Sequence, residues 1–139
     1  MDIQLHKGTQ YAIQALEWMV EEEDGNPVDV REVARHVNVS PTYLAKIFQQ
    51  LTQNDILVSR RGRMGGFSLR KGPDDIHLAD IVMACEKFDR QRVCMLDGKI
   101  CTGRKVRCRI HPVWLRIQTE IRNLFENTSL SDILGKARN

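Results

Sequence analysis

Residues 40–70 constrain the fold of this chain more than any other segment. Ser40 and Pro41 form a strong helix start, because serine caps free backbone amides and proline suits the first helical position. Apolar residues then recur at positions i, i+3, i+4 and i+7, which predicts a helix over residues 41–54 with one buried stripe. The stripe consists of Leu44, Ile47, Phe48 and Leu51.

A basic hairpin is predicted after this helix. Residues 56–60 and 67–70 have the pattern of strands, and the turn between them contains three glycines, which permit positive φ and close backbone approach. Residues 59–71 carry five cationic side chains and no acidic one, which favours contact with a polyanion. A nucleotide-phosphate site is a weaker interpretation of the glycines, because the spacing of a P-loop and a following helix are missing.

Two helices are predicted before this unit, over residues 9–22 and 29–36. The order helix, turn, helix, hairpin predicts a winged helix-turn-helix, a mainly α fold with a small two-stranded β wing. The exposed face of the third helix is polar and cationic without acidic residues, which suits the major groove of DNA. The predicted DNA-binding residues are Ser40, Thr42, Tyr43, Lys46 and Gln49 at the third helix and Arg60, Arg61 and Arg63 in the hairpin.

A further helix is predicted over residues 112–126. Its apolar side chains exceed what a domain of this size readily buries, so a two-fold dimer interface and packing onto its own domain are equally good interpretations. They are Val113, Trp114, Leu115, Ile117, Ile121, Leu124 and Phe125. The predicted division is a DNA-binding domain over residues 1–86, a cysteine-bearing loop over 87–111, and a dimerisation helix with a tail over 112–139.

The four cysteines require an explanation other than disulfides. No signal peptide or membrane-spanning run is visible, so we expect a cytoplasmic protein, and disulfides are rare there. Cys85 falls on the apolar face of a helix predicted from residue 80 and is expected in the core. The other three are separated by six residues each, and a histidine follows three positions after the last: Cys94, Cys101, Cys108 and His111.

The spacing of these three cysteines requires a loop if they are to converge on one centre. Five Lys and Arg residues in the same segment favour thiolates, which metal binding and reactivity both need. Structural zinc sites usually pair close cysteines, and no such pair exists here, so the spacing modestly favours an iron–sulfur cluster over zinc. Chance placement in an irregular segment is the remaining interpretation.

Motifs along nearly the whole chain carry a family resemblance. They are residues 9–13 (TQYAI), 30–34 (VREVA), 40–47 (SPTYLAKI), 61–69 (RGRMGGFSL) and 76–82 (IHLADIV). Together they make the chain resemble the IscR/NsrR-type family of winged-helix transcription regulators. The resemblance implies a homodimer, paired through long C-terminal helices, that binds a roughly palindromic double-stranded DNA operator.

The resemblance also implies a sensor. Cys94, Cys101 and Cys108 match the cluster-binding cysteines of that family, although the family often spaces them by five residues, which leaves the choice between [2Fe-2S] and [4Fe-4S] open. His111 fits the fourth ligand, because Gln10 occupies the position of the alternative acidic ligand. We therefore expect a repressor that senses redox state, nitric oxide or iron through this cluster. The alternative is a cluster-free thiol switch or a zinc-binding regulator of the same fold.

An enzyme is not expected. The four histidines are scattered along the chain, and no pairing of a nucleophile with a base stands out.

Overall fold

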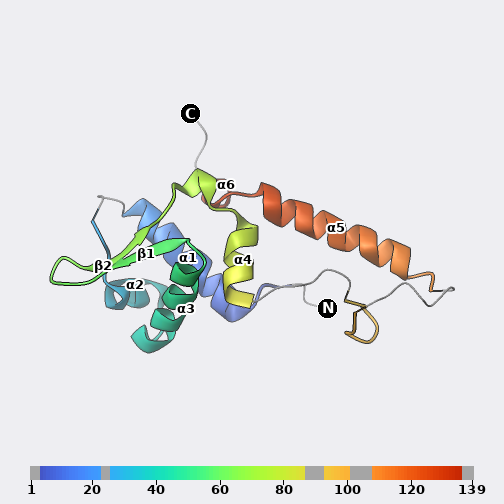
Figure 1. The fold of residues 1–139 in the computed structure, drawn as a ribbon, viewed down its shortest axis with the longest axis horizontal. Coiled ribbons are helices and arrows are strands. Elements are labelled where there is room, and N and C mark those ends of the chain that lie inside the picture. The colour runs from blue at the N-terminus through green and yellow to red at the C-terminus, as the bar shows by residue number, and fades with distance from the viewer. Residues whose placement is uncertain (1–3, 23–25, 87–92, 101–107, 136–139) are drawn as a thin grey trace.

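The computed structural model describes residues 4–22, 26–86, 93–100 and 108–135. A head made mainly of helices carries a two-stranded antiparallel sheet, and one helix extends away from it (Figure 1). This mainly helical architecture confirms the predicted fold class. The elements are α1 (Lys7–Glu21), α2 (Val30–Val37), α3 (Pro41–Gln53), β1 (Leu57–Arg60), β2 (Gly66–Leu69), η1 (Pro73–Asp75), α4 (Leu78–Glu86), α5 (His111–Asn127) and α6 (Leu130–Ile133).

Helix α3 begins as its sequence predicts. The Ser40 hydroxyl accepts the backbone N–H of Tyr43 at 3.1 Å, and Pro41 is the first helical residue. The four apolar residues of the predicted stripe are all buried in the core of the head. The sequence pattern therefore predicts both the start of α3 and its inward face.

Helix α1 begins earlier than its apolar periodicity predicts, because a distant residue caps it. The Glu86 carboxylate accepts the backbone N–H of His6 at 2.7 Å and the hydroxyl of Thr9 at 2.8 Å. The Glu86 side chain is only 1% exposed, and Thr9 is fully buried. A carboxylate at a helix N-terminus satisfies free amides and complements the helix dipole, so the end of α4 holds the start of α1.

The wing, formed by β1, β2 and the turn over residues 61–65, is attached to the helices. Phe67 of β2 exchanges two backbone hydrogen bonds with Val28, each 2.8 Å long, so a single-residue bridge extends the sheet beyond its two strands. The Phe67 ring also packs edge-on against Phe48 of α3, with 5.0 Å between ring centroids. These contacts fix the wing relative to α3.

The far end of α5 returns to the head through α6. Leu130 is fully buried in the core of the head, and its N–H donates to the Ile76 carbonyl at 2.7 Å. The N–H of Leu78 donates to the carbonyl of Thr128 at 2.8 Å. Ser129 and Asp132 cap the short helix reciprocally. The segment after α5 is therefore attached to residues 76–78, where α4 begins.

The apolar surface of α5 is divided between two faces. One row is half-buried and consists of Trp114, Gln118, Ile121 and Phe125, at helical spacing. A second row is exposed, and we call it the outer stripe: Ile110, Val113, Ile117 and Leu124. The two rows lie side by side on the helix: the half-buried row matches the predicted self-packing, and the outer stripe is open to the predicted dimer contact. No helix within the described ranges is long and apolar enough to cross a membrane.

Candidate DNA interface and cysteine site

The exposed face of α3 carries the predicted base-reading side chains. Thr42, Lys46 and Gln49 are all exposed on this helix. Tyr43 is more restricted: it is 39% exposed, and its ring lies edge-on to Tyr11 of α1 with centroids 6.0 Å apart. Tyr43 is therefore held against α1, whereas the three exposed polar side chains can adjust to a ligand.

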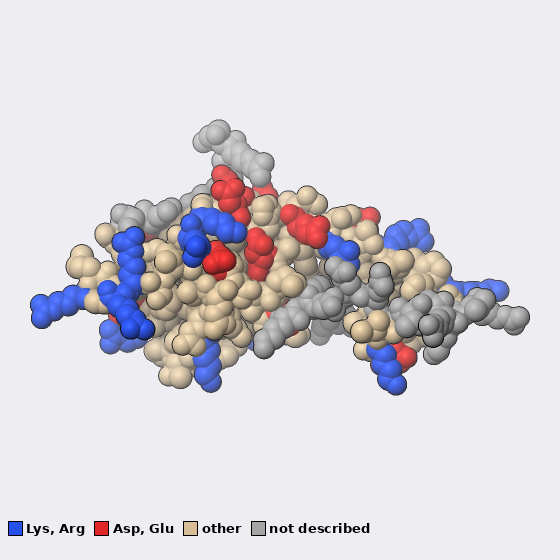
Figure 2. Space-filling model, viewed as in Figure 1, with Lys and Arg blue, Asp and Glu red and all other residues tan. Residues whose placement is uncertain are grey.

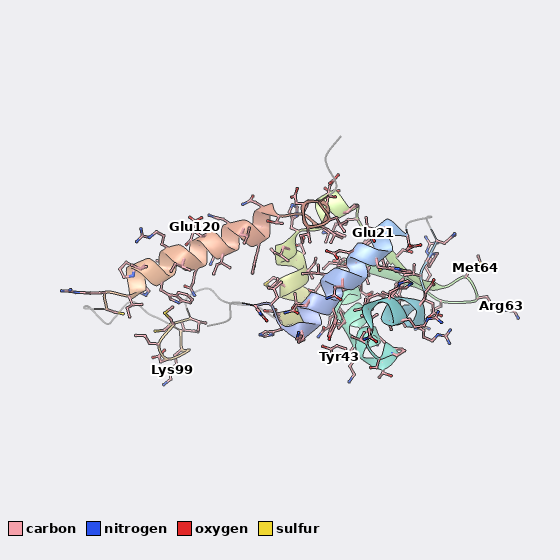
Figure 3. All side chains as sticks on the ribbon, turned by 180° about the vertical axis from the view of Figure 1, so that it is seen from behind. Glu21, Tyr43, Arg63, Met64, Lys99 and Glu120 are labelled. Atoms are coloured by element: carbon pink, nitrogen blue, oxygen red, sulfur yellow. The ribbon has the colours of Figure 1, made fainter. Side chains whose placement is uncertain are left out.

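The wing projects positive charge away from the head. Arg60, Arg61 and Arg63 are exposed, and Figure 3 shows Arg63 together with Met64 at the tip of the wing. Lys and Arg side chains lie at this end of the molecule and also at the opposite end, whereas acidic side chains lie mainly over its middle (Figure 2). Gly62 adopts a φ of 105°, which lets the turn present these arginines on a short loop.

Sequence reasoning missed the cationic contribution of α2. Arg31 and Arg35 are exposed on this helix, four residues apart, which is the signal that could have revealed them. Together with Asp29, Glu32 and Pro41 they line an open hollow of about 470 Å³ next to the start of α3. The Asp29 carboxylate binds Arg31 at 2.7 Å and caps α2. This side-chain hydrogen bond, followed by that from the Arg31 backbone, lowers the pKa of Asp29 to about 2.

Cys94 lies in a small closed loop over residues 93–100, which we call the Cys94 loop. The N–H of Cys94 donates to the Lys99 carbonyl at 2.8 Å, and the N–H of Gly98 donates to the Cys94 carbonyl at 3.0 Å. The Cys94 sulfur accepts the backbone N–H of Leu96 at 3.4 Å. Hydrogen bonds of this kind tune sulfur ligands of iron.

The other predicted ligands are only partly described. Cys108 is half-buried just before α5, and His111 is the first residue of that helix. Cys101 lies outside the described residues. Within the described part of the chain, no three His, Cys, Asp or Glu side chains are grouped to hold a metal ion. The donor types, thiolate and imidazole, match iron–sulfur ligation, but their convergence stays a prediction.

Cys85 has a different environment from Cys94. It is half-buried on α4 and packs against the core, as its place on an apolar helical face predicts. Burial, together with the neighbouring Glu86 charge, raises the pKa of the Cys85 thiol to about 11. Cys85 is therefore a neutral thiol near pH 7 and a poor metal ligand.

Residues 5–136, almost the whole chain, match the Rrf2 family, which is described as iron-dependent transcriptional regulators. The chain belongs to the Rrf2 family. This confirms the resemblance to IscR/NsrR-type regulators. One relative, the HTH-type transcriptional regulator IscR of Photorhabdus laumondii, is 25% identical over 131 residues, covering 91% of this chain and 76% of the relative.

Solved structures share the fold. The Rrf2 chain superposes on CymR, the global cysteine regulator of B. subtilis, with a TM-score of 0.75 and 22% identity over 96% of this chain and 98% of CymR. It also superposes on T. potens IscR with a TM-score of 0.73 and 23% identity, over 99% and 90% of the two chains. The Rrf2 relatives are transcriptional regulators, so this chain is a transcription regulator of a DNA-binding family and not an enzyme.

Proposed function

We propose that this Rrf2 protein is a homodimeric repressor that senses redox state, nitric oxide or iron through a cysteine-bound iron–sulfur cluster. The observation that carries the proposal is the Cys94 loop, where a backbone amide is aimed at the sulfur of a half-buried cysteine. The description of the family as iron-dependent and the IscR relatives support it.

In this proposal Cys94, Cys101, Cys108 and His111 hold the cluster. A bound cluster supplies a centre that changes oxidation state or is lost on exposure to oxidants. Lys99 and Arg109 are exposed cations close in sequence to the ligand positions. The Leu96 N–H donates to the Cys94 sulfur.

The DNA-binding mode follows from the two projecting elements. We assign base reading to α3 and backbone contacts to the wing, with Arg35 as a further phosphate-binding candidate. The outer stripe of α5 pairs with that of a second copy, because an exposed apolar row at this spacing suits helix pairing. A two-fold dimer presents two α3 helices to a roughly palindromic operator.

Lys46→Ala and Arg61→Ala are expected to change DNA binding in different ways. Loss of Lys46 should weaken the preferred operator by about tenfold and change which bases are preferred, because its side chain is assigned to base edges. Loss of Arg61 should weaken all DNA sequences alike and lower the salt dependence of log K by about 1, because its contact is electrostatic. Binding titrations against an operator library at several salt concentrations measure both. Equal, sequence-independent losses from both changes would contradict this division.

A cluster-free thiol switch is the second candidate. It is supported by the fold shared with CymR of B. subtilis. The oxidised form of Staphylococcus aureus CymR shares this fold as well. In this version the same cysteines form or break a disulfide, or they hold zinc, and α3 and the wing contact DNA as in the first proposal.

Absorption spectroscopy separates the candidates. We expect protein purified without oxygen to be brown and to contain matching amounts of iron and sulfide. Cys101→Ala should remove colour and iron, whereas the matched change Cys85→Ala should leave both, because Cys85 is a neutral core thiol. A colourless wild-type protein that binds no iron after anaerobic reconstitution would reject the cluster and favour zinc or free thiols.

A further inference from the structure

The Cys94 loop is held by two side chains of α5. The carbonyl of Val93 accepts the indole N–H of Trp114 at 2.7 Å and the side-chain amide of Gln118 at 3.2 Å. Both donors lie in the half-buried row, one helical turn apart, so they reach the same point. A carbonyl oxygen has two lone pairs, and α5 supplies a donor for each. Val93 immediately precedes Cys94, so this contact fixes the backbone that carries the first cysteine.

The same helix is fastened to the head at its other end. Backbone hydrogen bonds join Thr128 to Leu78 and Leu130 to Ile76. Helix α5 has 17 residues, a length of about 25 Å at the usual rise. In Figure 3 Lys99 of the Cys94 loop and Arg63 of the wing lie at opposite ends of the molecule. A rigid helix held at both ends is therefore a physical connection between the cysteines and the DNA-binding head.

We propose that Trp114, assisted by Gln118, is a positioning residue that fixes Cys94 onto α5 and passes the state of the cysteines to that helix. The inference rests on the proposed function in taking Cys94 as a sensing residue. The indole N–H is the essential group, because it makes the shorter of the two bonds and cannot be replaced by a ring that lacks a donor. Trp114→Phe removes this bond, keeps an aromatic ring at the position and loosens the start of the Cys94 loop.

Trp114→Phe in cluster-free protein tests the positioning directly. Hydrogen exchange of the Cys94 and Gly98 amides should become about fivefold faster, the ratio expected from losing one hydrogen bond of ordinary net strength. Trp18→Phe is the matched control. It is the same change at the only other tryptophan, which stacks on His36 in the head, and it should leave exchange in the Cys94 loop unaltered. Gln118→Met should give a smaller increase, because its bond is longer.

A second measurement follows the release of iron from reconstituted protein. Trp114→Phe should release iron to a chelator about fivefold faster than Trp18→Phe does, and the ratio of operator affinities between loaded and cluster-free protein should shrink. Unchanged hydrogen exchange in Trp114→Phe would overturn the inference. A wild-type protein that binds no iron would overturn the cluster proposal instead, and the hydrogen-exchange result would still decide whether Trp114 positions Cys94.

Discussion

Replacing Leu124 with arginine is expected to convert the protein to a monomer and to weaken operator binding by about 100-fold or more. Leu124 is 59% exposed in the outer stripe of α5, where a second copy would bury it. A charge there would be buried without a partner in the dimer, so association becomes unfavourable. Two linked heads bind two half-sites with an avidity gain of about 10²–10⁴, which a monomer loses.

Asn123→Arg is the matched control for this change. Asn123 neighbours Leu124 on α5 and is exposed, but it lies in the polar row with Arg116 and Glu120. It adds the same charge without entering the outer stripe, so the protein should remain a dimer. Sedimentation equilibrium gives the mass of each variant, and fluorescence anisotropy gives its operator affinity. A dimeric Leu124→Arg variant with unchanged affinity would show that the outer stripe is not the dimer interface.

Gly66→Ala is expected to lower the free energy of unfolding by about 3 kcal/mol and to detach the wing from the helices. Gly66 has a φ of 147°, a conformation that side chains strongly disfavour. A methyl group there would lie 2.4 Å from the carbonyl oxygen of Val28. Relief of this contact requires breaking the two backbone bonds between Val28 and Phe67. DNA affinity should fall together with stability, because the wing arginines lose their fixed position.

Gly72→Ala provides the comparison. Its added methyl group would meet only a side-chain oxygen of Asp75 at 4.0 Å, and its φ is −64°, so stability should hardly change. Urea unfolding measures both variants, and the bridge amides can be followed by hydrogen exchange. If Gly66→Ala unfolds at the same urea concentration as Gly72→Ala, the pairing of Val28 with the wing does not contribute to stability.

Much of the fold could be predicted because its signals are local. The cap at Ser40, the buried stripe of α3 and the glycine-rich turn of the wing each depend on residues a few positions apart. The same is true of Cys85, whose place on an apolar helical face is enough to indicate a core residue.

Contacts between distant residues could not be predicted from these patterns. Glu86 caps α1, and Val28 pairs with Phe67, yet neither partner has a recognisable sequence signature. Periodicity predicts that α5 is broadly apolar, but it does not separate the row bound to Val93 from the outer stripe. The arrangement of Cys101 with its predicted partners stays a prediction, because it depends on how a long irregular segment closes.

The return of the chain at Leu130 has a consequence for how the protein is made. Core residues of α1–α4 leave the ribosome well before Leu130 does, yet Leu130 is fully buried among them. A nascent chain that ends within α5 therefore leaves an apolar surface near Ile76 uncovered. Incomplete domains of this kind are prone to aggregation and to capture by chaperones. Docking of this segment onto the head is therefore a late step of synthesis, because the core of the head is completed only after α5 has emerged.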